Sequence, residues 1–168
     1  MKSLPTATVL GMALAALLAG CETPSQPTKT AFDPAAYAPY QQAGTGKLSG
    51  QAFLKTVGGD VKFGAGDEVT LSPATEFFKE LMAFNAQGIN PSTLTDAVSK
   101  EVMSHSRKAT ADGNGNFEFT GLPAGEYALE VVITWQVPSQ IGLQGTGGLV
   151  SKLVTVGDGE SVRVVLTR

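Results

Sequence analysis

The residues with the best spacing for metal binding are Asp112, Asn114 and Asn116, which alternate near the start of a Gly-rich stretch. Oxygen ligands at alternate positions are typical of a calcium loop, which also needs glycine at its sixth position and glutamate at its twelfth. Counted from Asp112, these positions hold Phe117 and Pro123, which excludes an EF-hand. Asp, Asn and Gly also suit a tight hairpin. We predict a turn, and a weak surface calcium site stays open as the alternative.

The chain offers little material for catalysis. Its single histidine, His105, is flanked by Ser104 and Ser106, but no Gly-x-Ser-x-Gly nucleophile elbow is present. Glu118 and Glu130 are the candidate pair of glycosidase carboxylates, yet strand alternation places both on outward, solvated faces. With one histidine and one cysteine, a zinc site is not expected. We expect a protein that is not an enzyme and has no cofactor.

Two aromatic residues are candidates for stacking against a sugar ring. Trp135 and Tyr127 fall on one face of a strand predicted over residues 126–137. The same face carries Leu129 and Val131, and aromatic rings among such residues belong more often to a core. Both interpretations stay open for Trp135 if it lies near the end of the strand.

A second set of apolar residues supplies more apolar surface than one helical face can bury in the domain. These residues lie in a segment with helical spacing and are Phe77, Phe78, Leu81, Met82 and Phe84. Covering the rest of the domain is the ordinary role of such residues. If the face is exposed, it marks a contact with a partner protein.

The N-terminus has the form of an export signal. Lys2 precedes an apolar run that ends in small residues, which is typical of a signal peptide over residues 1–20 and too short for a membrane span. The residues that resemble the bacterial lipobox are Leu18, Ala19, Gly20 and Cys21. The resemblance implies that Cys21 is acylated, for example with palmitate, and anchors the protein to a membrane. Because residue 22 is Glu rather than Asp, it implies the outer membrane, on its periplasmic face.

The composition describes one domain of moderate size. The chain has 168 residues, a net charge of -3, 20 glycines and 9 prolines, which favours a fold rich in turns and strands. Lysine and arginine are scattered, so no basic face for nucleic acid is expected. Cys21 is the only cysteine, so no disulfide can form within the chain.

Period-two patterning predicts about seven strands in a β-sandwich, interrupted by one helical insertion at about residues 73–103. Ser72-Pro73 and Asn90-Pro91 are predicted to start its two helices. Pro138 is expected to end the long strand, and a Gly-rich connection is expected to follow it. The predicted strands cover residues 48–56, 68–71, 107–111, 116–119, 126–137, 148–156 and 161–167.

The segment between the cysteine and the domain is predicted to be a disordered tether. Residues 21–46 are rich in Pro, Thr, Gln and Ala and show no helical or strand period. Such a tether would reach about 75 Å as polyproline II and about 30 Å as a coil. Tyr37 and Tyr40 either dock onto the domain or a partner, or are merely tolerated there. The folded domain is predicted over residues 47–168.

The stretch DGNGNFEFTGLPAGEYALEV resembles the signature hairpin of carboxypeptidase regulatory-like domains, which share a transthyretin-like (prealbumin-like) β-sandwich. The opening strand at Leu48–Ala52 and the closing VTVGDGESVRVVLTR also match that family. The match departs at the helical insertion and at residues 135–148. The resemblance implies a fold rather than a function, because such domains serve as folding, spacing or binding modules.

We therefore expect a non-catalytic envelope lipoprotein that acts as a structural or protein-binding module. The alternatives are a carbohydrate- or peptidoglycan-binding module, with Trp135 as its platform, and a lipoprotein of a secretion apparatus. An exposed Trp135 favours sugar, whereas an exposed Phe77 face favours a protein partner.

Overall fold

The structure is a computed structural model and describes residues 24–168. The predicted signal peptide, the lipobox residues Leu18, Ala19 and Gly20, and the lipidation site Cys21 lie outside the described residues. Within residues 24–168, no helix is long and apolar enough to cross a membrane.

One sheet is built around β2 (Gly46–Lys55). β10 (Ser161–Leu166) runs parallel to β2, and β7 (Asn116–Leu122) pairs antiparallel with its first half. β3 (Val61–Phe63) pairs antiparallel with the last three residues of β2. The second sheet has the order β6-β4-β8-β9, and all of its pairs are antiparallel.

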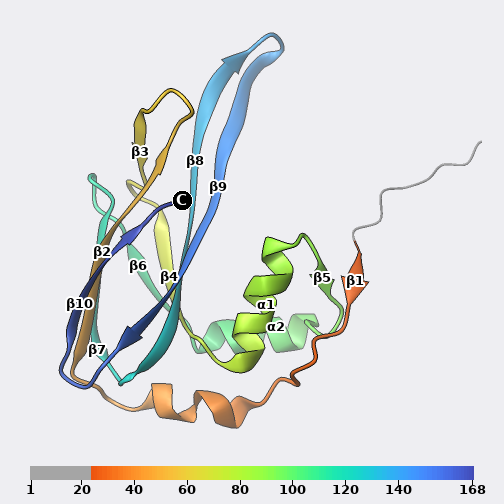
Figure 1. Cartoon of the computed structure of the whole chain (residues 1–168), viewed down its shortest axis with the longest axis vertical. Helices are drawn as coiled ribbons and strands as arrows, with labels where there is room; N and C mark the ends of the chain where they lie inside the picture. The colour runs from red at the N-terminus through yellow and green to blue at the C-terminus, as the bar shows by residue number, and fades with distance from the viewer. Residues whose placement is uncertain (1–23) are drawn as a thin grey trace, which may run out of the picture.

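The strands of the second sheet differ greatly in length. β6 (Arg107–Thr110) and β4 (Glu68–Pro73) are short, whereas β8 (Gly125–Ser139) and β9 (Gly142–Val156) have 15 residues each. β4 pairs with β8 only as far as Val69↔Val131. The upper part of β8 and β9 therefore projects as a two-stranded ribbon, which we call the arm (residues 132–149; Figure 1).

The two sheets pack face to face around one core, which confirms the predicted mostly-β sandwich. Alternate residues of each strand point inward, as period-two patterning requires. Burial of each large aliphatic side chain stabilises the fold by about 1.5–3 kcal/mol. The core residues from both sheets include Leu48, Val69, Leu122, Leu129, Val131, Val156 and Leu166.

The predicted strands are confirmed in position, but the long strand and the strand that follows it are both longer than predicted. The long strand continues through Pro138 to Ser139, and the Gly-rich connection predicted to follow it forms the first half of β9. A proline in a strand removes one N–H donor, which is tolerated where the strand has a free edge. The arm supplies such an edge, since β8 pairs there only with β9.

Both predicted helices exist, but they start later than expected. α1 (Glu76–Ala86) is capped by Thr75 and α2 (Asp96–Ser104) by Thr95, whose hydroxyls accept the N–H groups of Phe78 and Val98. Ser72-Pro73 instead ends β4, paired with Ala128 and Tyr127 of β8. Asn90-Pro91 forms β5 (Asn90–Pro91), not a helix start.

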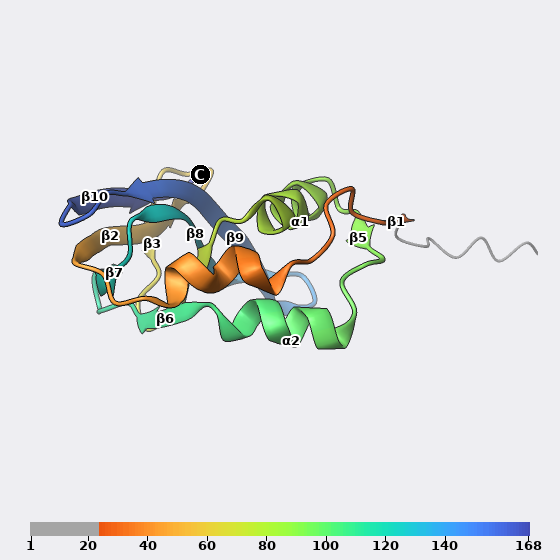
Figure 2. The same cartoon turned by 90° about the horizontal axis from the view of Figure 1, so that it is seen from below.

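Residues 24–45 lie against the domain, so the prediction of a disordered tether is wrong for this stretch, which we call the strap. β1 (Ser25–Gln26) pairs with β5, and the 3-10 helix η1 (Pro34–Gln41) runs below the sandwich between the two helices (Figure 2). Its apolar side chains explain the difference: Phe32 packs on Phe77, and Tyr37 is 1% exposed.

The polar groups of the strap are also held. Glu80 of α1 accepts the backbone N–H groups of Lys29 and Thr30 at 2.7 and 2.9 Å. These two bonds hold the pKa of the Glu80 carboxyl below its ordinary value. The hydroxyls of Thr28 and Thr93 lie 2.8 Å apart. Hydrogen bonds as well as apolar contacts therefore hold the strap against the helical insertion.

Candidate functional site

The Asp112 stretch forms the predicted turn between β6 and β7. The Asp112 Oδ1 atom accepts the backbone N–H groups of Asn114 and Asn116, both at 2.8 Å, and the Asn116 side-chain amide donates to both carboxylate oxygens. Gly115 has a φ of +76°, a conformation that favours glycine. The hydrogen bonds hold the pKa of Asp112 below its ordinary value. The carboxylate thus stabilises the turn, and residues 24–168 contain no cluster of three His, Cys, Asp or Glu for a metal.

His105 lies at the end of α2 in a packing role. Its ring stacks on Tyr37 with centroids 4.4 Å apart, and its Nδ1 atom lies 3.2 Å from the Gln41 amide nitrogen. Glu101 is 3.5 Å from Nε2. Ser106 is hydrogen-bonded to Ser72 instead of to the imidazole. The contacts of His105 connect α2 to the strap, and they do not form a Ser-His-Asp arrangement.

The two candidate glycosidase carboxylates do not face each other. Glu118 lies exposed on the outer face of the first sheet, whereas Glu130 lies on the outer face of the second. A glycosidase needs its two carboxyl groups on either side of one bond. Glu130 also departs from the prediction of a solvated residue, because the helical insertion half-buries it.

Tyr127 belongs to the core, so its prediction as a sugar platform is wrong. The side chain is 3% exposed, and its hydroxyl donates to the Pro123 carbonyl at 2.7 Å. Burial raises the pKa of Tyr127 to about 12. The strap adds a further layer, since Tyr40 packs edge-on against this ring.

Trp135 lies further along the same face of β8 and is only half-buried. Its side chain packs against the core, and the residue lines a groove of about 440 Å³ between the base of the arm and the end of β2. Thr146 stands directly opposite Trp135 on β9. The groove is lined by one aromatic ring, two hydroxyl side chains, apolar groups and cations, a combination suited to a small polar ligand.

Arg168 is held at this groove by the backbone of β9. Its guanidinium donates to the Gly147 carbonyl at 3.2 Å. A Cβ atom on Gly148 would lie 2.9 Å from the Arg168 Nη2 atom, so the glycine leaves the space that the guanidinium fills. Sequence reasoning has no basis for associating Arg168 with Trp135, because Arg168 follows β10 of the first sheet and Trp135 lies on β8 of the second, so the two meet only in the folded protein.

The apolar residues predicted to contact a partner divide into two groups. Phe77 and Phe78 are 3% and 6% exposed, so their prediction as partner contacts is wrong in this structure. They pack with Ala128 on the outer face of the second sheet. Leu81, Met82 and Phe84 are half-buried, and the first two pack at the edge of this cluster.

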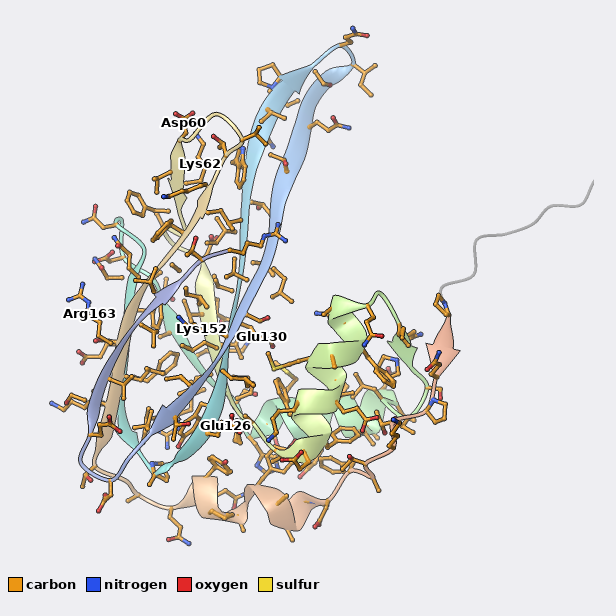
Figure 3. All side chains as sticks on the ribbon, viewed as in Figure 1. Asp60, Lys62, Glu126, Glu130, Lys152 and Arg163 are labelled. Carbon is orange, nitrogen blue, oxygen red and sulfur yellow. The ribbon has the colours of Figure 1, made fainter. Side chains whose placement is uncertain are left out.

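A pocket of about 480 Å³ lies between α1, α2 and the outer face of β8. Its lining is mainly apolar and includes Leu81, Met82, Leu94 and Met103. Glu130 is the only ionisable side chain of this lining and has no ion pair within the described residues. Figure 3 shows Glu130 on β8, on the side of the sheet where the helices lie. Its burial raises the pKa of the Glu130 carboxyl.

Replacing Glu130 with glutamine is expected to stabilise the protein at pH 7 by about 1 kcal/mol. Because the folded-state pKa is raised, the folded protein keeps a proton that the unfolded chain has released, so stability falls as pH rises from 4.5 through the folded pKa. The gain should therefore vanish below pH 4.5. Urea unfolding of both proteins across this range measures it, with the exposed Glu118→Gln as the control. An equal gain at all pH values would contradict this explanation.

No family model and no curated protein matches the sequence. Among solved structures, the minor pilin GBS52 of Streptococcus agalactiae is 18% identical, with a TM-score of 0.40 over 74% of this chain and 44% of that one. The chain thus spans less than half of that pilin, and a likeness at this level carries no argument.

A nearer structure is that of the Pseudomonas aeruginosa protein PA1324, a candidate carbohydrate-binding protein. It is 31% identical to this chain, with a TM-score of 0.66, over 82% of this chain and 97% of that one. At this identity, and with nearly all of that protein covered, the two share a family as well as a fold. The chain described here belongs to the same protein family as PA1324 of Pseudomonas aeruginosa.

Proposed function

We propose that this protein is a non-catalytic carbohydrate-binding module of the bacterial cell envelope, with Trp135 as the platform for a sugar ring. The observation that carries the proposal is the position of Trp135, the only tryptophan of the chain, half-buried in a groove beside hydroxyl and guanidinium groups. A ring that packs against the core and also lines the groove is held in place before the ligand arrives, which limits the entropy lost on binding. The relationship to PA1324 supports the same ligand class.

The proposal includes a lipid anchor. The lipobox-like residues before Cys21 support acylation of this cysteine, and Glu22 supports the outer membrane, with the domain on the periplasmic side. The hairpin motif supports a carboxypeptidase regulatory-like variant of the sandwich. Mass spectrometry of the N-terminal peptide from wild-type and Cys21→Ala cells tests the anchor separately from ligand binding.

A protein partner is the second candidate function, on a different surface. The pocket between α1 and α2 keeps Leu81 and Met82 accessible at its wall, whereas Phe77 and Phe78 are buried. An envelope protein, including a component of a secretion apparatus, would have to insert an apolar side chain here. Crosslinking from Met82 in intact cells tests this candidate.

Replacing Trp135 with alanine is expected to weaken oligosaccharide binding strongly, because it removes the stacking surface and leaves only the polar wall of the groove. The measurement is a glycan microarray with neutral and acidic oligosaccharides, followed by calorimetry with the best ligand. We expect affinity to fall at least about tenfold, which corresponds to about 1.4 kcal/mol.

Phe63→Ala is the matched control, because Phe63 is an aromatic residue of β3 that is 43% exposed and does not line the groove. Binding should survive this change. If Phe63→Ala abolished binding and Trp135→Ala did not, the sugar site would lie on the β2–β3 hairpin, and the groove would not be the site.

A further inference from the structure

The charged side chains that line the Trp135 groove are all cationic. Lys55 at the end of β2 and Arg168 both line it, and no aspartate or glutamate among residues 24–168 does. The segments that form the walls of the groove account for the absence of acidic side chains. β2 has no acidic residue, and residues 131–157 have none either. The chain as a whole carries a net charge of -3, so this local excess of cations runs against the charge of the molecule.

Neither cation forms an ion pair with another residue of the described part of the chain. The ion pairs within residues 24–168 involve Lys79, His105 and Lys108. Arg168 donates one hydrogen bond to the Gly147 carbonyl, which leaves most of its donors free for a ligand. Figure 3 places Asp60 and Lys62 on the neighbouring β2–β3 hairpin, and neither lines the groove.

We propose that the Trp135 groove selects acidic sugars, with the sugar ring stacked on Trp135 and its carboxylate bound by Arg168 and Lys55. This inference rests on the proposed carbohydrate-binding function and names its ligand class. The guanidinium matches a carboxylate in a planar, bidentate geometry, and the flexible lysine supplies a second, longer-range charge. Both cations are exposed, so salt should weaken their attraction for the ligand.

Two ligands that differ only in charge test the proposal. Oligogalacturonate is the acidic probe, and its methyl ester keeps the same rings without the carboxylates. Each is titrated into the purified full chain, and the fluorescence of the single tryptophan reports occupancy of the groove directly. We expect the acid to bind about tenfold more tightly than the ester at low salt. We also expect this difference to shrink severalfold in 0.5 M NaCl, since the Debye length there is only about 4 Å.

Charge variants assign the effect to residues. Arg168→Gln and Lys55→Gln should each reduce the affinity for oligogalacturonate severalfold and leave the affinity for the ester unchanged. Arg163→Gln is the matched control, because Arg163 is a cation of β10 that lies away from the groove (Figure 3). This substitution removes the same charge from the protein as Arg168→Gln does. It should change neither affinity.

The outcomes separate this inference from the proposed function. If the ester and neutral oligosaccharides bind as tightly as the acid, charge selection is wrong and sugar binding stands. If Arg163→Gln weakens acid binding as much as Arg168→Gln, the attraction is general and the groove cations do not select. If no oligosaccharide, acidic or neutral, perturbs Trp135, both proposals fall.

Discussion

Tyr37→Ala is expected to destabilise the protein by about 3–5 kcal/mol, the usual range for truncating a fully buried aromatic residue. Tyr37 is 1% exposed, packs against Phe32 with ring centroids 5.9 Å apart, and stacks on His105. Its loss would leave a cavity between the strap and both helices. Because the strap contacts the domain largely through such rings, we expect its release as well as a lower Tm.

Urea unfolding and limited proteolysis measure the two effects. The alanine variant should be cut within residues 24–45 under conditions that leave the wild type intact. Tyr37→Phe is the control: it removes only the hydroxyl that accepts a 3.2 Å hydrogen bond from Thr75 and should cost about 1 kcal/mol. An alanine variant as stable as the phenylalanine variant would show that the strap contributes little to the fold.

Gly147→Ala is expected to cost about 3 kcal/mol or more and to disorder the base of the arm. Gly147 has a φ of +117°, and a Cβ atom there would lie 2.1 Å from the Ile133 carbonyl oxygen. Backbone cannot yield as a flexible side chain does. Since Gly147 pairs with Thr134, next to Trp135, and carries the carbonyl that binds Arg168, the groove should lose its shape.

Gly145→Ala is the matched control on the same strand. Gly145 has no positive φ, and a Cβ atom there meets nothing within 4 Å. It should change stability by less than about 0.5 kcal/mol. Tryptophan fluorescence and denaturant unfolding compare the two variants. Equal stability of both would mean that β9 relaxes around residue 147.

The strands could be predicted from the sequence because alternation decides them. Tyr127, Leu129, Val131 and Ile133 alternate along β8 with residues of the outer face, and all four lie in the core between the sheets. The register between sheets and the arm could not be predicted in the same way. The glycines of residues 142–148 favour a loop, because glycine weakens a strand. These residues form a strand because they pair with β8, and that pairing cannot be seen in their own sequence.

The strap shows the limit of reasoning from composition. Its prolines and small polar residues indicate disorder, although the segment also holds three aromatic rings, Phe32, Tyr37 and Tyr40. The rings are decisive because the helical insertion provides a surface for them, and that surface exists only after α1 and α2 have packed on the second sheet. The sequence of residues 24–45 alone therefore cannot predict that this surface exists.

The candidate site was predicted in part. Trp135 could be identified by its residue type and its place near the end of a strand. Lys55 and Arg168 could not, because they come from the ends of two other segments and approach Trp135 only in the folded sandwich. Tyr127 was indistinguishable from Trp135 by alternation alone, and its burial comes from β4, which pairs with it, and from Tyr40 of the strap, which packs on its ring.

If Cys21 carries a lipid, the docked strap sets the height of the domain above the membrane. The Pro24 carbonyl accepts the Asn90 N–H at 2.9 Å, so the domain begins three residues after Cys21. Three residues span at most about 10 Å, whereas a free tether would span several times that distance. A lipid on Cys21 would therefore hold the β1–β5 side of the protein against the headgroups. The arm lies on a different side of the molecule (Figure 1). The groove at its base would therefore stay at a nearly constant distance from the bilayer, and the domain could move little relative to its anchor.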